Sequence, residues 1–194
     1  MIKAILFDCF GVLVGTGFEH TYRMAGGDPV KDRPFIDDML GQANLGLITQ
    51  EDFQESLTKQ LSVSADTWHK AVEQSEQPDF ELLRYIEHLH KTYKTGVLSN
   101  ANFGAVEARI GGEWLEKCFD EVIVSAEIGL IKPDPAIYHY AAERLGVEPG
   151  QCAFLDDSPG HLETARDLGL HTILYKGFPQ AKKELERLLA DTKR

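Results

Sequence analysis

The chain has 194 residues, of which 43% are hydrophobic and 26% are charged, a composition typical of a folded globular protein. Its 31 acidic residues outnumber its 20 lysines and arginines, and the resulting formal charge of −11 argues against binding to nucleic acid or to an anionic membrane surface. This length suffices for one domain with an inserted piece, but not for two full domains.

Five short apolar segments predict buried parallel strands, because each is too short to form a core helix. They are residues 4–7, 95–98, 121–124, 152–155 and 171–175. Segments with the apolar spacing of helices lie between and after these strands, at residues 80–89, 105–119, 136–145, 162–168 and 179–191. This alternation of strands and helices predicts an α/β fold with a parallel sheet.

The stretch between the first and second predicted strands is much longer than one crossover helix requires. It contains polar helical segments, such as 51–60 and 66–74, and no evident strand. Helices inserted directly after the first strand would stand on the side where α/β sheets bind their ligands. We therefore predict a core made of residues 1–14 and 79–194, with a helical cap inserted at residues 15–78.

The cysteines and the apolar pattern bear on the compartment. Cys9, Cys118 and Cys152 have neither the spacing of a zinc site nor that of a disulfide framework, so we expect buried reduced thiols. No signal-like core follows Met1, and no run of about 18 apolar residues occurs. These features favour a cytoplasmic protein that does not enter a membrane, and the lack of a large apolar surface stripe favours a monomer.

Polar side chains follow four of the predicted strands: Asp8, the pair Ser99 and Asn100, then Lys132, and the pair Asp156 and Asp157. The ends of parallel strands converge on one edge of a sheet, so these groups should share a small volume. Three carboxylates in one place require a cation, and oxygen ligands suit Mg²⁺. We expect Asp157 to bind the metal directly and Asp156 to bind it through water, because adjacent side chains rarely point at one atom.

The remaining groups suit phosphoryl transfer. Asp8 is best placed to attack phosphorus in line and form an acyl phosphate, provided that a cation offsets the repulsion between the two anions. Lys132 would bind phosphate oxygens and keep Asp8 ionised. Ser99 and the main-chain amides near Asn100 would donate hydrogen bonds to the transferring group.

Four segments of the chain resemble, in order, the motifs of the haloacid dehalogenase superfamily. They are Phe7-Asp8-Cys9-Phe10-Gly11-Val12-Leu13, Val97-Leu98-Ser99-Asn100, Gly129-Leu130-Ile131-Lys132-Pro133-Asp134-Pro135 and Phe154-Leu155-Asp156-Asp157-Ser158-Pro159. The resemblance implies a Rossmann-like sheet with a small α-helical cap, and phosphatase activity toward a small phosphorylated metabolite. It also implies Mg²⁺ held by Asp8, Asp157 and the main-chain carbonyl of Phe10. Residues 98–102 are similar to those of sugar-1-phosphate phosphatases of the superfamily.

The chain departs from the family pattern at Phe10. Phosphatases of the superfamily usually carry a second aspartate at this position, which protonates the leaving oxygen and then activates water. A phenyl ring transfers no proton, and general acid or base catalysis is typically worth about 10² to 10⁴ in rate. The departure leaves three functions open.

The first is a phosphatase whose leaving group needs little protonation, such as an anomeric or acyl phosphate, or whose proton donor comes from the cap, where His20 is a candidate. The second is a 2-haloacid dehalogenase-like hydrolase, which would need no magnesium and would use a cap arginine, Arg23 or Arg33, for the substrate carboxylate. The third is a catalytically weak relative that binds a phosphorylated ligand or a protein. We favour the first, because the lysine and double-aspartate motifs are intact. We expect the other histidines, including His161, to be surface or core fillers.

Overall fold

A five-stranded parallel sheet forms the centre of the computed structural model, which describes residues 1–15 and 17–191. The strands are β1 (Ala4–Phe7), β2 (Lys94–Ser99), β3 (Glu121–Val124), β4 (Cys152–Asp156) and β5 (His171–Leu174). All five predicted strands form, with each end within about one residue of its expected place, as is usual for strand boundaries. The structure confirms the parallel α/β, Rossmann-like fold.

The order of the strands in the sheet is β3-β2-β1-β4-β5. The chain therefore builds the sheet outward from β1 through β2 to β3, and then returns to the other side of β1 with β4. Phe7 pairs with Val97 on one side and with Leu155 on the other, so Asp8 and Asp156 follow at the same level. Open α/β sheets bind their ligands outside the carboxyl ends of the strands at such a reversal of strand order.

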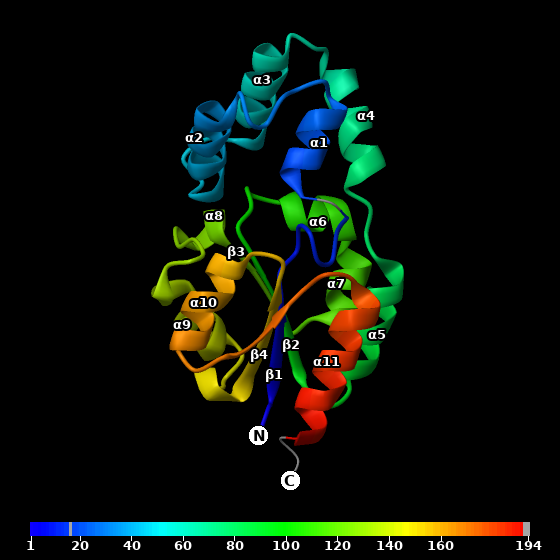
Figure 1. The fold of residues 1–194 in the computed structure, drawn as a ribbon, viewed down its shortest axis with the longest axis vertical. Helices are drawn as coiled ribbons and strands as arrows, with labels where there is room; N and C mark the ends of the chain where they lie inside the picture. Colours follow the sequence, from blue (N-terminus) through cyan, green and yellow to red (C-terminus); the bar gives the residue numbers. More distant parts are fainter. Residues whose placement is uncertain (16, 192–194) are drawn as a thin grey trace.

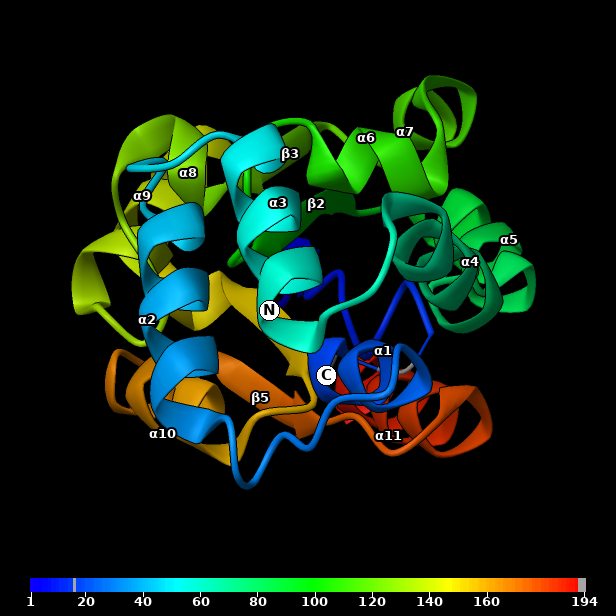
Figure 2. The same cartoon turned by 90° about the horizontal axis from the view of Figure 1, so that it is seen from above.

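Helices cover both faces of the sheet (Figures 1 and 2). One face is covered by α5 (Phe80–His90), α6 (Ala105–Ile110), α7 (Gly112–Cys118) and α11 (Phe178–Asp191), whose apolar residues pack with Ile5 and Phe7. The other face is covered by α9 (Pro135–Arg144) and α10 (Pro159–Asp167), which pack with Ala4 and Leu6. Alternate residues of β1 thus point to opposite faces, as the pleat of a strand requires. The short α8 (Ser125–Ile128) follows β3, and a 3₁₀ turn, η1 (Pro149–Gln151), precedes β4.

The helix predicted at residues 105–119 is two helices, α6 and α7, separated by Gly111. The φ angle of Gly111 is +83°, which lies outside the right-handed helical region. Residues that carry a side chain rarely adopt this angle, whereas glycine does so readily. The apolar spacing alone did not reveal this break, because both helices pack against the same core.

Four helices stand over the carboxyl edge of the sheet, at the end of the molecule opposite both termini (Figure 1). They are α1 (Phe18–Met24), α2 (Arg33–Asn44), α3 (Gln50–Leu61) and α4 (Ala65–Ser75). They have a hydrophobic cluster of their own, in which Tyr22, Leu57 and Trp68 are buried. The expected helical segments 51–60 and 66–74 lie in α3 and α4. The boundaries of the proposed cap, 15–78, stay a prediction.

The three cysteines are free and buried, as predicted. Burial raises the pKa of the Cys9 thiol well above its usual range, so this neighbour of Asp8 stays a protonated, unreactive group. Among residues 1–15 and 17–191, no helix is both long enough and apolar enough to cross a membrane.

Candidate active site

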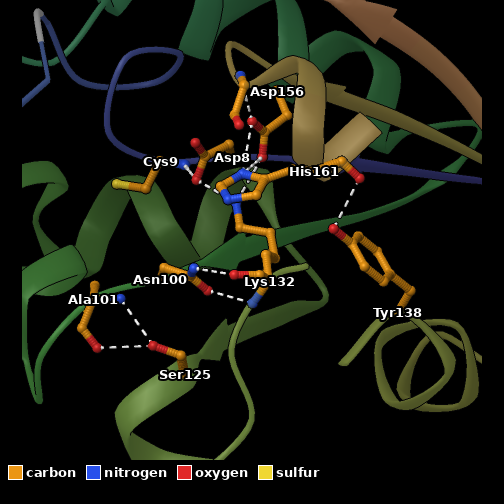
Figure 3. A network of polar contacts seen from close by, with 10 residues as sticks. Asp8, Cys9, Asn100, Ala101, Ser125, Lys132, Tyr138, Asp156 and His161 are labelled. Carbon is orange, nitrogen blue, oxygen red and sulfur yellow. Dashed lines mark hydrogen bonds and ion pairs between the residues drawn. The ribbon is translucent and has the colours of Figure 1, made fainter. Parts of the chain in front are cut away.

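Asp8 lies directly after the central strand β1, and its side chain is 9% exposed. Its Oδ1 oxygen accepts hydrogen bonds from the Lys132 ammonium, at 2.8 Å, and from the main-chain N–H of Cys9, at 2.7 Å (Figure 3). Within the described part of the chain no donor contacts its other oxygen, Oδ2. The carboxylate is therefore held in place through one oxygen and offers the second one to a ligand.

Lys132 lies in the loop after α8, and its side chain is fully buried. Besides Asp8, its Nζ contacts Asp156 Oδ2 at 2.7 Å. Burial alone would lower the pKa of Lys132, but the charges of Asp8 and Asp156 outweigh it and hold the pKa above its ordinary value. The side chain is thus a permanent positive charge between two carboxylates.

Asn100 fixes the backbone at Lys132. Its Nδ2 donates to the Lys132 carbonyl oxygen and its Oδ1 accepts from the Lys132 N–H, both at 2.8 Å. This pair of hydrogen bonds ties the loop after β2 to the loop that carries the lysine. The Asn100 side chain, predicted to lie near the phosphate, is therefore engaged in positioning Lys132. The next main-chain amide of this loop, that of Ala101, donates to Ser125 Oγ at 3.0 Å.

Asp156, at the end of β4, makes the most contacts of the three carboxylates. Besides Lys132, it accepts from the Ser158 N–H at 2.8 Å and lies 3.0 Å from His161 Nδ1 (Figure 3). Burial raises the pKa of Asp156, but the hydrogen bond with His161 and the charge of Lys132 lower it by more, so the net shift is downward. His161 was expected to be a filler. Its position in the first turn of the helix that follows the double aspartate was the only sequence signal for this contact.

Asp8, Asp156 and Asp157 each offer a carboxylate oxygen within 4.8 Å of the others. Burial, opposed by Lys132, raises the pKa of Asp8 to about 6, and burial with the nearby Asp156 charge raises that of Asp157. Three carboxylates face one ammonium, so this cluster carries an excess of negative charge. An oxygen-rich, negatively charged site of this kind fits a hard divalent cation such as Mg²⁺.

Gly11 provides the space for this cluster. A Cβ atom built on Gly11 would overlap Oδ2 of Asp157, and the residue has a φ angle of +90°. Only glycine satisfies both conditions without strain. The loop after β1 thus approaches the Asp157 carboxylate so closely that no side chain fits between them.

Ser99, at the end of β2, carries a fully buried hydroxyl that has no hydrogen-bond partner in the described structure. Buried polar groups without a partner are rare, and each one calls for an explanation such as a ligand or an ion. Its position beside the Asn100 loop, one strand away from Asp8, fits a donor to a phosphate oxygen.

A cavity of about 190 Å³ lies between the four helices α1–α4 and the loop after β2. Phe10 and Asn100 form part of its wall, so it adjoins the cluster around Asp8. None of the three candidates from the helical region, His20, Arg23 and Arg33, is among the described residues that line it. Both arginines instead pair with Glu19 at the surface.

A family model for haloacid dehalogenase-like hydrolases matches residues 2–169. The phosphatase MT3486 of Mycobacterium tuberculosis is 30% identical over 210 residues, which span 97% of this chain and 94% of that protein. The (S)-2-haloacid dehalogenase 4A of Burkholderia cepacia is 31% identical over 81 residues, which span 42% of this chain and 35% of that protein. The bifunctional epoxide hydrolase 2 of Rattus norvegicus and the acyl-CoA dehydrogenase family member 10 of Mus musculus are much longer proteins, and this chain spans only 13% and 19% of their length.

Among solved structures, a similar one is a haloacid dehalogenase family enzyme from Bacteroides thetaiotaomicron, in complex with magnesium and inorganic phosphate. The two chains superpose with a TM-score of 0.72 at 25% identity, over 91% of this chain and 95% of that one.

Proposed function

This chain belongs to the haloacid dehalogenase-like hydrolase family, and we propose that within this family it is a magnesium-dependent phosphatase with Asp8 as its nucleophile. The observation that carries the proposal is the geometry at the edge of the sheet. A carboxylate with one unengaged oxygen lies 2.8 Å from a buried ammonium, and the unpartnered Ser99 hydroxyl ends the neighbouring strand. The full-length match to a phosphatase and the structural similarity to an enzyme that binds magnesium and phosphate support it.

The first step would transfer the phosphoryl group to Asp8. A carboxylate oxygen forms a bond to phosphorus while the ester P–O bond breaks, and the leaving oxygen departs with the bonding electron pair. Because the pKa of Asp8 is about 6, the carboxylate is largely ionised at neutral pH. Lys132 and Ser99 would donate to the phosphoryl oxygens, where negative charge is concentrated. Attack of water on phosphorus then releases inorganic phosphate and restores Asp8.

The cation would be held by Asp8, Asp157 and the main-chain carbonyl of Phe10, with Asp156 bound through water. When bound, Mg²⁺ would supply the charge that offsets repulsion between the attacking carboxylate and the phosphate. The Asp157 carboxylate has a hydrogen bond only from its own main-chain N–H in the described structure, whereas Asp156 is engaged by Lys132, His161 and the Ser158 N–H. This difference supports Asp157 as the direct ligand.

The dehalogenase alternative draws on the partial match to a haloacid dehalogenase and on the aromatic residue at position 10. It requires an arginine for the substrate carboxylate. Arg23 and Arg33 pair with Glu19 at the surface, and Arg109, which does line the cavity, pairs with Glu76 at 2.6 Å. The phosphatase therefore has the stronger support.

The test is phosphate release from p-nitrophenyl phosphate with and without Mg²⁺. We expect Asp8→Asn to lower the rate by roughly four orders of magnitude or more, because it removes the nucleophile. Asp167→Asn, a change at an exposed aspartate of α10, serves as the matched control and should leave the rate unchanged.

Two further measurements separate the alternatives. Isothermal titration calorimetry should detect Mg²⁺ binding that Asp157→Asn weakens, a readout that does not depend on turnover. Chloride release from 2-chloropropionate without metal, in the absence of phosphate release, would replace the phosphatase by the dehalogenase. If neither phosphate nor chloride is released, the third alternative, a catalytically weak relative that binds a ligand, is favoured.

A further inference from the structure

The cavity beside the active site has a mainly aromatic and aliphatic wall. Its apolar lining includes Phe10, Phe18, Leu40, Phe53, Trp68 and Val72. The ring of Phe18 lies 6.0 Å, centre to centre, from the rings of both Phe53 and Trp68. These rings come from three of the four helices that stand over the sheet, so they form a continuous aromatic surface facing the strand edge.

Three of the polar side chains in this wall are engaged with other groups of the protein. Arg109 pairs with Glu76 at 2.6 Å, and the same glutamate accepts from the Thr21 hydroxyl at 3.0 Å. Both side-chain hydrogen bonds of Asn100 are made to the backbone of Lys132. The side-chain NH₂ groups of Asn102, Asn44 and Gln50 make no such contacts in the described part of the wall. Nδ2 of Asn102 is buried without a partner, whereas Asn44 and Gln50 are half-buried.

The mainly aromatic and aliphatic wall suits an apolar group better than a sugar as the group carried by the phosphate. A pentose or hexose would bring several hydroxyls into the cavity, and each buried hydroxyl without a partner weakens binding. The unengaged amides of Asn44, Gln50 and Asn102 can pair with some of these hydroxyls, but the aromatic part of the wall offers them no partner. An apolar group, in contrast, gains contact with the ring surface and leaves the existing hydrogen bonds intact.

The chemistry at Phe10 adds an independent restriction. No proton donor stands at this position, and the cap candidate His20 does not line the cavity, so a leaving oxygen that departs as a stable anion is favoured. A phenol has a pKa of about 10, as the tyrosine side chain does, and its anion is far more stable than that of an aliphatic alcohol. Among alcohols, a phenol or a similar aromatic alcohol combines an apolar body with a stable anion.

We propose that the substrate is an aryl phosphate, the phosphate monoester of an aromatic alcohol with a single ring, whose ring occupies the cavity between Trp68, Phe53 and Phe10. This inference rests on the proposed phosphatase function and specifies its substrate class. The size agrees, because an engineered cavity of about 150 Å³ binds benzene, and this cavity measures about 190 Å³. A substituent that accepts a hydrogen bond would find the unpartnered Asn102 amide.

The first experiment compares four substrates in the presence of Mg²⁺: phenyl, cyclohexyl, acetyl and glucose 1-phosphate. Phenyl and cyclohexyl phosphate have nearly the same size, so their ratio measures the leaving-group requirement, and kcat/KM should favour phenyl by about 100-fold. Phenyl phosphate should exceed glucose 1-phosphate by about tenfold or more, because only the phenyl group suits the apolar wall. Equal kcat/KM values within either pair would overturn the assignment of the substrate class. Hydrolysis of acetyl phosphate in the same assay would show that the phosphatase function itself holds.

Variants of the wall provide a second test. Val72→Thr places a hydroxyl in the wall at nearly constant volume, and Ala105→Leu reduces the space. In both, the ratio of kcat/KM for phenyl phosphate to that for acetyl phosphate should fall by about tenfold. Val147→Thr, outside the cavity, is the matched control and should keep the wild-type ratio. An unchanged ratio in both cavity variants would contradict the placement of the ring.

Binding separates failure of the substrate class from failure of the enzyme. Phenylphosphonate and methylphosphonate differ only in the group that would enter the cavity, and calorimetry measures both without turnover. We expect phenylphosphonate to bind about tenfold more tightly or better, and the same affinity for both would refute the inference. If phenylphosphonate binds more tightly but no phosphate ester is hydrolysed, the phosphatase function is refuted, whereas the binding site for the aromatic ring is supported.

Discussion

Phe10 occupies the position from which phosphatases of the superfamily usually protonate the leaving group, and its side chain can donate no proton. The residue is half-buried and contributes both to the wall of the cavity and to the packing of the main core. Lack of a proton donor here affects poor leaving groups far more than good ones. Activity should therefore depend steeply on the leaving group.

Phe10→Asp tests this dependence. The variant should accelerate hydrolysis of cyclohexyl phosphate by about 10² or more and that of phenyl phosphate much less, because only the alkyl leaving group gains from protonation. Phe10→Asn has similar size and polarity but donates no carboxyl proton, and it serves as the control. Steady-state kinetics with both substrates provide the measurement, and equal acceleration of both would refute the leaving-group argument.

Gly11 sets the distance between the loop after β1 and Asp157. Because a Cβ atom here would overlap the carboxylate, Gly11→Ala should displace Asp157 and weaken Mg²⁺ binding by about 10-fold or more. Gly17→Ala is the matched control, since a Cβ atom there meets no atom within 4 Å. Calorimetric titration with Mg²⁺ measures the effect, and wild-type affinity in Gly11→Ala would rule out Asp157 as a direct ligand.

Asp120, far from the active site, gives the structure a predictable response to acid. Its carboxylate contacts Lys94 at 2.6 Å and accepts from the Thr95 N–H at 2.9 Å. Burial raises its pKa, but these contacts outweigh burial and lower the pKa below its ordinary value. The stabilisation is therefore present above the pKa of the unfolded chain and is lost as the pH falls through the folded pKa.

Asp120→Asn should accordingly lower the free energy of unfolding by about 1 to 2 kcal/mol at pH 7. The difference between this variant and the wild type should shrink as the pH is lowered below about 4, where both side chains are neutral. Urea denaturation of the two proteins at pH 7 and pH 3 measures it. A difference that stays constant with pH would show that charge is not its source.

At the scale of secondary structure, two polar contacts join the four helices to the elements around the sheet. Glu76, at the end of α4, pairs with Arg109 of α6. On the other side, Ser125 of α8 donates to the Asn44 carbonyl of α2 at 2.6 Å. The cavity lies between these two points of contact. They set the separation of its two walls.

The pair of Glu76 and Arg109 is largely buried, with side-chain exposures of 7% and 20%. Arg109→Met should lower the free energy of unfolding by about 2 to 4 kcal/mol, because it leaves a buried carboxylate without its partner charge. Arg144→Met, which breaks the exposed pair with Glu121, should cost at most about 1 kcal/mol.

The double variant Arg109→Met with Glu76→Gln completes this test. Because it removes the unpaired charge, it should recover part of the stability lost in Arg109→Met alone. Chemical denaturation of the two single variants and the double variant supplies the comparison. Additive losses would indicate that the two side chains are not coupled.

At the scale of the whole molecule, charge and cavity select different properties of the ligand. The chain carries a formal charge of −11, yet the site adds a buried ammonium and a predicted cation next to the nucleophile. Together they would offset the charge of the three carboxylates, so a small dianion would meet less repulsion there than elsewhere on the molecule. On the proposal above, the helices over the sheet would then select such ligands by the group attached to the phosphate.

Much of this protein follows from sequence alone. Short apolar runs such as 152–155 identified every strand, because a run that is apolar throughout and too short for a core helix is typical of a buried parallel strand. The polar residues after those runs predicted which groups gather around Asp8, since the carboxyl ends of parallel strands share one edge. The position of Phe10 within its motif likewise showed that the usual acid is absent there.

Only the tertiary structure decided what surrounds these groups. It placed His161 against Asp156, engaged the Asn100 amide with Lys132, and brought Trp68, Phe53 and Phe10 from distant segments into one wall. Such contacts depend on how helices pack across a sheet, and apolar spacing along the chain gives the buried face of a helix but not its partner. Sequence therefore determined the chemistry expected at Asp8, and packing determined the shape of the space that a substrate must fit.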